Sequence, residues 1–119
     1  MSQQKVFRIP SKGAGYEALQ EKTESIPQIE PHQVLLRVQA VSLNFRDIAI
    51  STGIYPFLVK DEVVPVSDAS GIIEQVGSAV VGLQTGDWAI ANFDPTNLYG
   101  PQKGNKNYCG MIGSRRQTY

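Results

Sequence analysis

An alternating stretch over residues 34–40 constrains the fold more than any other feature of the sequence. Its even positions are apolar and its odd positions mostly polar: Val34, Leu36, Val38 and Ala40 alternate with Leu35, Arg37 and Gln39. Successive side chains of a strand point to opposite faces, so this pattern predicts a strand with one apolar face. After Ala40 the apolar residues move to odd positions, and we therefore expect a bulge near Ala40.

A short helix is predicted directly after this strand. Asn44 is a good N-cap residue, and Asp47 follows three positions later, near the positive end of the helix dipole. Apolar residues then recur at helical spacing until Gly53, a residue type that commonly ends helices. We expect the helix to run from Phe45 to Ser51.

Elsewhere the chain contains short apolar runs separated by glycine and proline. Strands are predicted at 6–9, with a hairpin partner at 16–19, and at 63–66, 71–76 and 88–91; residues 26–31 form an extended linker and residues 77–87 a loop. Several short strands with one helical turn indicate a mostly-β barrel or sandwich.

The composition restricts the kinds of protein that the chain can be. Its 119 residues fit one domain, and eleven Lys and Arg balance eleven Asp and Glu. Zero net charge argues against a basic nucleic-acid-binding surface, and no apolar run is long enough to span a bilayer. The start of the chain lacks the apolar segment of a secretory signal, and the lone Cys109 forms no internal disulfide. We therefore expect a cytoplasmic protein with no nucleic-acid and no membrane partner.

The balanced total hides a charge asymmetry between two parts of the chain. Residues 1–100 contain all eleven acids and carry a net charge of −4, whereas residues 101–119 carry +4 from two lysines and two arginines. The last nineteen residues also lack hydrophobic periodicity. The sequence thus predicts a folded domain over 1–100, whose completeness stays open, followed by a basic, loosely ordered tail over 101–119.

Four segments resemble the N-terminal half of the medium-chain dehydrogenase/reductase superfamily: 34–47 (VLLRVQAVSLNFRD), 53–56 (GIYP), 64–77 (VPVSDASGIIEQVG) and 86–89 (GDWA). In that superfamily a GroES-like, alcohol dehydrogenase N-terminal-like domain precedes a Rossmann domain that binds the cofactor. The resemblance covers roughly Lys5 to Tyr99. It implies a mostly-β fold, a GroES-like partly open β-barrel with one or two short helices and no Rossmann domain.

Within the superfamily the chain most resembles the zinc-free, quinone-oxidoreductase-like branch. The zinc-dependent alcohol dehydrogenases have a cysteine where this chain has Asn44, and His-Glu where it has Ser67 and Asp68. A catalytic zinc needs three protein ligands and an open position, and two of the three are lost here. The resemblance therefore implies a zinc-independent protein with no metal ligands.

The zinc-free relatives transfer a hydride from NADPH to a conjugated carbonyl or quinone. By resemblance, Asn44 and Tyr55 are the candidate catalytic residues, and Asn44 and Asp47 the candidate cofactor-binding residues. Each also has a purely structural interpretation: Asn44 as a helix cap, Asp47 as a first-turn helix acid, and Tyr55 as a packed loop aromatic. Ser67 and Asp68 are more simply interpreted as a turn without chemistry.

A Rossmann unit would show a strand, a Gly-x-Gly-x-x-Gly turn and a helix, and the sequence contains no such arrangement. We therefore expect no cofactor to be bound by this chain alone, although NADPH is implied for the full-length family. The expected partners are a small carbonyl or quinone-type ligand and either a cofactor-domain chain or a second copy of this chain.

Three interpretations of function stay open at this point. The chain is the substrate-side domain of an NAD(P)H-dependent quinone, enone or enoyl reductase, inactive in hydride transfer alone. Alternatively, it is a GroES-like ligand-binding or interaction module, a pseudoenzyme or non-redox biosynthetic protein. A third alternative is a truncated splice or frameshift product.

Overall fold

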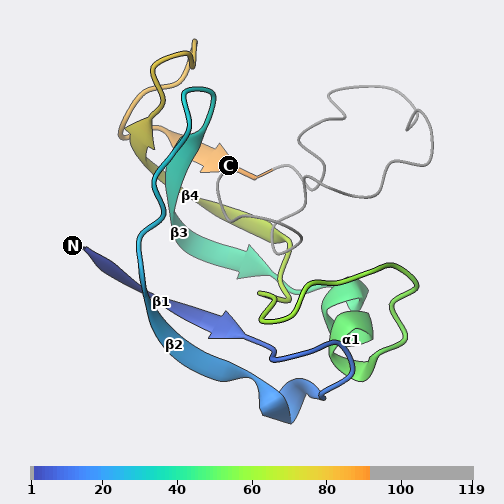
Figure 1. The fold of residues 1–119 in the computed structure, drawn as a ribbon. Helices are drawn as coiled ribbons and strands as arrows, with labels where there is room; N and C mark the ends of the chain where they lie inside the picture. The colour runs from blue at the N-terminus through green and yellow to red at the C-terminus, as the bar shows by residue number, and fades with distance from the viewer. Residues whose placement is uncertain (1, 92–119) are drawn as a thin grey trace, which may run out of the picture.

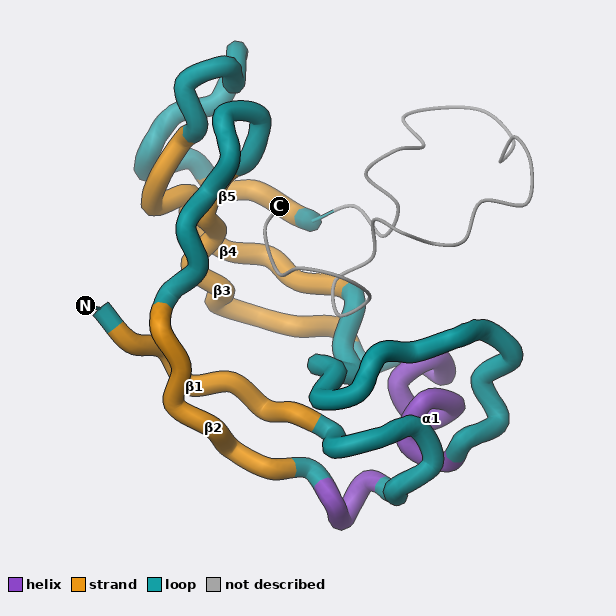
Figure 2. The backbone as a smooth tube through the Cα atoms, in the orientation of Figure 1, coloured by secondary structure: helices purple, strands orange, loops and turns teal. Residues whose placement is uncertain are grey.

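The computed structural model describes residues 2–91, arranged as two antiparallel sheets and one short α-helix (Figures 1 and 2). The predicted tail 101–119 and Cys109 lie outside the described residues. The elements are β1 (Gln3–Arg8), a 3-10 turn η1 (Tyr16–Ala18), β2 (Gln20–Ser25), β3 (Val34–Ser42), α1 (Phe45–Thr52), β4 (Asp68–Val76) and β5 (Trp88–Ile90).

The two sheets are separate and do not close on each other. β1 pairs with β2, and the second sheet has the order β3-β4-β5. Figure 2 shows the two-stranded and three-stranded sheets facing each other, with α1 near one end of both. The predicted class, a mostly-β and partly open GroES-like fold with few helices, is confirmed.

The predicted hairpin partner at 16–19 is wrong, because residues 16–18 form a 3-10 turn and the partner strand begins at Gln20. The connection is longer than expected because it first crosses to the end of α1. There the amides of Gly13 and Gly15 donate to the carbonyls of Ile50 and Ser51, at 3.1 and 2.8 Å. The last carbonyls of a helix have no partner within it, so this loop satisfies two of them.

The predicted bulge in β3 is confirmed, since the register with β4 shifts between Val38 and Ala40. The predicted apolar face, however, is only partly buried. Leu35, at an odd position, is buried, whereas Val38 is 47% exposed. Val38 lines a cavity between the two sheets, so its exposure follows from the open form of the fold.

The helix is one residue longer than predicted, ending at Thr52, and both of its ends are as expected. Asn44 is extended at the N-cap, and its backbone N–H donates to Asp47 Oδ2 at 2.7 Å. This is one half of a capping box. At the other end Gly53 is left-handed, with φ of 86°, a conformation that glycine adopts without strain.

The segment between α1 and β4 is not the strand that we predicted over 63–66. Val63 alone forms a bridge, with Ile9, whose N–H donates to the Val63 carbonyl at 2.9 Å. Ile9, Ile50 and Val63 are nearly fully buried and form one cluster of the hydrophobic core, with Tyr55 and Val59 packed against them. Pro65 has no N–H to continue a ladder, which explains why pairing stops.

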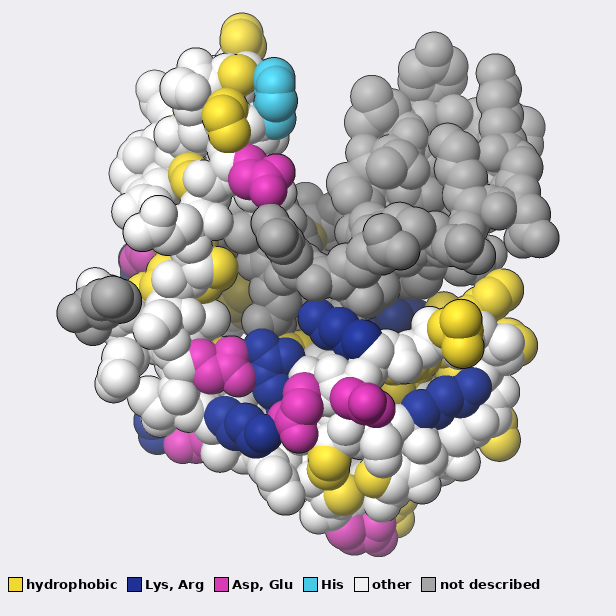
Figure 3. All heavy atoms as spheres, viewed as in Figure 1, with side chains coloured by type: hydrophobic (Ala, Val, Ile, Leu, Met, Phe, Trp, Pro, Cys, Tyr) yellow, Lys and Arg dark blue, Asp and Glu magenta, His cyan; other side chains and the backbone are white. Residues whose placement is uncertain are grey.

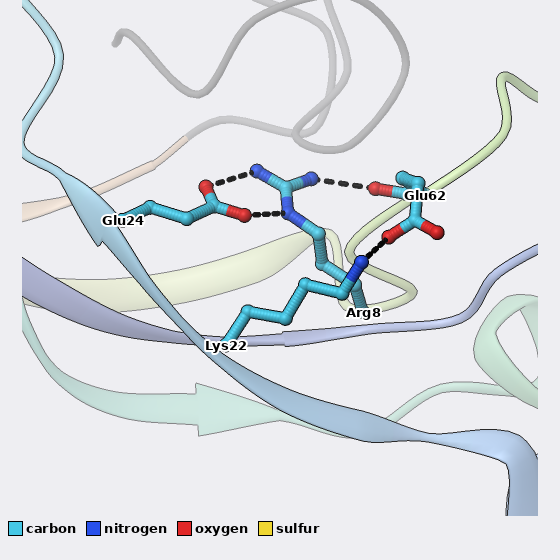
Figure 4. A network of polar contacts seen from close by, with 4 residues as sticks. All are labelled: Arg8, Lys22, Glu24 and Glu62. Carbon is cyan, nitrogen blue, oxygen red and sulfur yellow. Dashed lines mark hydrogen bonds and ion pairs between the residues drawn. The ribbon is translucent and has the colours of Figure 1, made fainter.

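A network of charged residues fastens this segment to the β1–β2 sheet (Figure 4). Arg8 donates to both carboxylate oxygens of Glu24, at 2.5 and 2.7 Å, and to the backbone carbonyl of Glu62 at 2.5 Å. Lys22 pairs with the Glu62 carboxylate. In Figure 3, blue and magenta side chains alternate across this face of the molecule. The network fixes the loop that follows Tyr55.

The cavity between the sheets has a volume of about 600 Å³. It is lined by apolar residues of both sheets and of the preceding and following segments, among them Val6, Ile26, Leu36, Val41, Val64 and Val66. Polar groups at its edges include Lys5 and the Arg37–Glu74 ion pair.

Candidate functional site

Asn44 lies where β3 ends and α1 begins, with an exposed side chain. Its amide nitrogen donates to Asp68 Oδ2 and, at 3.4 Å, to the Ser42 carbonyl. The two amide protons therefore face protein oxygens. The Asn44 amide oxygen faces the backbone N–H of Asp47, the other half of the capping box, and its second lone pair can accept from a ligand.

Asp47 lies in the first turn of α1 and is only 8% exposed. One carboxylate oxygen accepts the Asn44 backbone N–H, and the other, Oδ1, is buried with no hydrogen-bond partner among the described residues. Burial raises the pKa of Asp47, against the lowering effects of the Asn44 amide and the Arg46 charge. Asp47 thus braces the turn that carries Asn44.

Tyr55 is half-buried in the segment after α1, and its position is fixed by several contacts. Its backbone N–H donates to the Ala49 carbonyl at 3.1 Å, and its ring meets Phe57 edge-on at a centroid distance of 5.5 Å. Arg46 Nε donates to the Tyr55 hydroxyl at 3.3 Å, with Arg46 Cζ 5.2 Å from the ring centroid. Another Arg46 nitrogen, Nη1, donates to the Pro65 carbonyl at 3.2 Å.

This arrangement determines what the Tyr55 hydroxyl can do chemically. A phenol has one proton to donate and lone pairs that accept. Arg46 Nε–H donates a hydrogen bond to the oxygen, so the Tyr55 O–H is left to donate to another acceptor, such as a carbonyl oxygen. A cation beside the phenol oxygen also stabilises negative charge that develops there.

The structure brings the predicted residues together in two groups rather than one. Asn44 and Asp47 meet directly, and Asp68 joins them, whereas Tyr55 is joined to Arg46. The hydrogen bonds of the Asn44 and Tyr55 side chains go to different partners, and neither residue lines the cavity between the sheets. The groups are linked through the first turn of α1, which carries both Asn44 and Arg46.

Two contacting residues were missed or misjudged from the sequence. Arg46 carried no signal besides its place in the turn that begins at Asn44. Asp68 was interpreted with Ser67 as part of a turn, but it is the first residue of β4 and contacts Asn44. Ser67 is buried, at 1% exposure. The one available signal for Asp68 was its position, because Ser67 and Asp68 stand where the zinc-dependent alcohol dehydrogenases have His-Glu.

Over residues 2–91, no three His, Cys, Asp or Glu side chains lie together in an arrangement that could hold a metal ion. The same stretch contains no helix with the length and apolar character required to cross a membrane.

Two facing antiparallel sheets that stay open, with a capped helix leading out of β3, define the class as a GroES-like β domain. The match to known families agrees and makes the assignment specific. Residues 30–118 match the alcohol dehydrogenase GroES-like domain, and the chain belongs to this family. The match includes most of residues 101–119; the division of the chain at residue 100 stays a prediction.

Full-length relatives include a zinc-type alcohol dehydrogenase-like protein of Schizosaccharomyces pombe, 37% identical over 103 residues. That alignment covers 86% of this chain and 30% of the relative. The NADPH-dependent alkenal/one oxidoreductase of Arabidopsis thaliana chloroplasts is 37% identical over 81 residues, covering 66% of this chain and 20% of the relative. The chain therefore spans a third or less of the length of these relatives.

Solved structures show the same domain. The human synaptic vesicle membrane protein VAT-1 homolog-like protein superposes with a TM-score of 0.70 and 28% identity, over 76% of this chain and 29% of that chain. The Escherichia coli quinone oxidoreductase, solved with NADPH, superposes with a TM-score of 0.64 and 25% identity, over 73% and 26%. In both cases the match is to one part of a longer chain.

Proposed function

We propose that this chain is the substrate-side domain of a zinc-independent, NAD(P)H-dependent reductase of quinones or enones, and that it performs no hydride transfer by itself. Support comes from the named activities of its relatives and from the residues around α1. The zinc-type name of the Schizosaccharomyces pombe relative belongs to that protein. Zinc independence is proposed here because Asn44 and Ser67 are not zinc ligands in proteins.

The observation that carries the proposal is the contact between Arg46 and Tyr55. With its oxygen accepting from Arg46, Tyr55 is oriented to donate its own proton to the carbonyl oxygen of a ligand. In a reductase this oxygen gains negative charge as the substrate is reduced, and a preorganised donor stabilises that charge. Tyr55 is therefore the proposed catalytic residue, and Arg46 positions it.

Asn44 is the second proposed catalytic residue, and together with Asp47 it forms the proposed cofactor side of the site. Asn44 is an exposed residue, and the remaining lone pair of its amide oxygen suits a ligand that carries an amide N–H, as nicotinamide does. Asp47 acts indirectly, because it is buried and holds the Asn44 backbone. NADPH, when bound by a full-length relative, supplies the hydride; the residues described here position and hydrogen-bond the acceptor.

The first experiment is a titration of the 119-residue chain with NADPH, followed by nicotinamide fluorescence, together with an assay of quinone and enone reduction. We expect no binding and negligible turnover for the chain alone. Turnover should appear only when a cofactor domain, for example that of a quinone oxidoreductase, is supplied as a separate chain. Reduction of an enone by the purified chain alone would contradict the proposal.

The second experiment examines the ligand side directly. Tyrosine labelled with 13C at Cζ gives one resonance for each tyrosine, and Tyr55→Phe identifies the signal of Tyr55. An enone or quinone should shift this signal and leave that of Tyr16, which is 68% exposed on η1 and outside the Arg46–Tyr55 contact, unchanged. Tyr16→Phe is the matched control. A cytoplasmic location is part of the same proposal and is tested by fluorescent tagging.

A further inference from the structure

β5 is an edge strand with no partner on its outer side among residues 2–91. On its inner side, the Asp87 carbonyl and the Ala91 N–H are hydrogen-bonded to β4, each at 2.9 Å. Hydrogen-bonding direction alternates along an antiparallel strand. Trp88 and Ile90, between these positions, therefore direct their backbone N–H and C=O groups away from β4.

The side chains of this strand are also apolar and exposed. Trp88 is 69% exposed and Ile90 is 83% exposed, and because they are two residues apart they lie on the same face of the sheet. Edge strands of natural proteins are commonly protected by a charged residue, a proline or a bulge. The three residues of β5 contain none of these features.

We propose that β5 pairs with β5 of a second copy of this chain, antiparallel, about a two-fold axis between the two Ala89 residues. In this register Trp88 lies opposite Ile90 of the partner subunit, and by symmetry Ile90 lies opposite Trp88 of the partner subunit. Each pair exchanges two backbone hydrogen bonds, so the four outward N–H and C=O pairs are all used. Asp87 lies opposite Ala91 of the partner subunit, so no like charges meet.

The geometry favours this register over its neighbour. A pairing centred on Trp88 would place Gly86 opposite Ile90, but the Gly86 N–H already donates to the Ile73 carbonyl of β4 at 2.9 Å. The two hydrogen bonds that would need the Gly86 N–H groups are lost in that register. The strand is thus self-complementary about Ala89, which is why the proposed occupant is a second copy and not another strand.

The pairing joins two three-stranded sheets into one continuous sheet of six strands. It also buries an aromatic and a β-branched side chain against each other twice, a favourable type of cross-strand pair. This interface lies outside α1 and Tyr55, so it is independent of the reductase proposal, and each can fail without the other.

Sedimentation equilibrium of the full 119-residue chain tests the proposal. Trp88 is the only tryptophan, so its emission should also shift to the blue as concentration rises and the dimer forms. We expect Ile90→Lys to raise the dimer dissociation constant at least about tenfold, because both Trp–Ile pairs are lost and two charges enter the interface. Val81→Lys is the matched control, since Val81 is 93% exposed in the loop before β5 and should leave the dissociation constant unchanged.

A cross-linking experiment tests the register, and also decides the matter if Ile90→Lys fails to fold. Residues opposite each other in a non-hydrogen-bonded pair have Cα atoms about 4.5 Å apart, within the range that a disulfide spans. In a Cys109→Ser background, Ala89→Cys should form a covalent dimer under mild oxidation, and Val81→Cys should not. The proposal would be overturned by a monomeric wild-type chain or by a dimer that Ile90→Lys does not weaken. It would also be overturned if Ala89→Cys failed to cross-link, because β5 would then pair in another register or with another occupant.

Discussion

Gly71 is the position where the structure makes the sharpest prediction about stability. It lies in β4 opposite Val38, and a Cβ built on it would approach the backbone of β3. The nearest atoms would be the carbonyl oxygen of Arg37, the Arg37 carbonyl carbon at 2.8 Å and Val38 Cα at 3.0 Å. All three belong to main chain, which cannot rotate away as the end of a flexible side chain can.

The magnitude of the effect follows from these distances. Carbon atoms attract best at about 3.5–4.0 Å, so Gly71→Ala is short of contact distance by about 0.7–1.2 Å. Moving β3 and β4 apart by about 1 Å would stretch ladder hydrogen bonds from about 2.9 Å to well beyond their usual limit. Each weakened hydrogen bond costs about 1 kcal/mol, and overpacking adds to this. We therefore expect Gly71→Ala to lower the free energy of unfolding by about 3 kcal/mol. The total free energy of unfolding of a native domain is about 5–15 kcal/mol, so this loss is a large part of it.

The assay is urea unfolding followed by the emission of Trp88, which pairs with Ile72 next to Gly71 and so reports on this sheet. Gly82→Ala is the matched control: its φ is 84° and no atom lies within 4 Å of a built Cβ, so only backbone strain of about 1 kcal/mol applies. The close approach of β3 and β4 would be refuted as the cause if Gly71→Ala destabilised the chain no more than Gly82→Ala does.

Three further predictions concern charges and the candidate site. Burial raises the pKa of Asp47, so the folded chain binds this proton more tightly than the unfolded chain does. The contribution of Asp47 to stability therefore falls as pH rises from the ordinary Asp pKa of 3.8 through the raised pKa. Asp47→Asn should flatten this part of a stability–pH curve measured by urea unfolding. Arg8 lowers the pKa of Glu24, so the contribution of this pair to stability is present above the ordinary Glu pKa of 4.5 and is lost as pH falls through the lowered pKa. Arg8→Met should remove that dependence and lower the free energy of unfolding by about 1–2 kcal/mol at pH 7. A loss of stability as small as that of Lys5→Met, which removes an exposed ion pair, would exclude a structural role for Arg8. Arg46→Met should shift the Cζ resonance of Tyr55 and reduce the enone-induced shift of that resonance by about fivefold or more. It should change the unfolding midpoint less than Gly71→Ala does. An unchanged Tyr55 signal would show that Arg46 is not part of the site.

The features that the sequence predicted well are those fixed by neighbours along the chain. The helix after Asn44 begins and ends where its N-cap, Asp47 and Gly53 place it, because each of these residues acts within one helical turn. The bulge near Ala40 was visible because a bulge shifts the side-chain alternation of the strand itself.

The errors concern contacts between residues far apart in the sequence. The partner of β1 was placed too early because the docking of Gly13 and Gly15 onto the end of α1 leaves no local pattern. Val63 was predicted to lie in a strand, yet its one bridge is to Ile9, and the segment around it is held instead by side chains of β1 and β2. In both cases local propensity predicted a strand at a place where long-range contacts give another conformation.

The candidate site follows the same division, which explains why one half of it was easier to predict than the other. The group around Asn44 depends mainly on the local cap of α1, and only its contact with Asp68 crosses a long stretch of chain. Tyr55, in contrast, is held by Arg46, by the buried core and, through the loop that follows it, by the contacts of Arg8 and Lys22 with Glu62. Its position is therefore a property of the whole folded domain. A hydrogen-bond donor used in catalysis must be preorganised. If Tyr55 has its proposed role, its orientation is supplied by residues that a motif search around Tyr55 would not include.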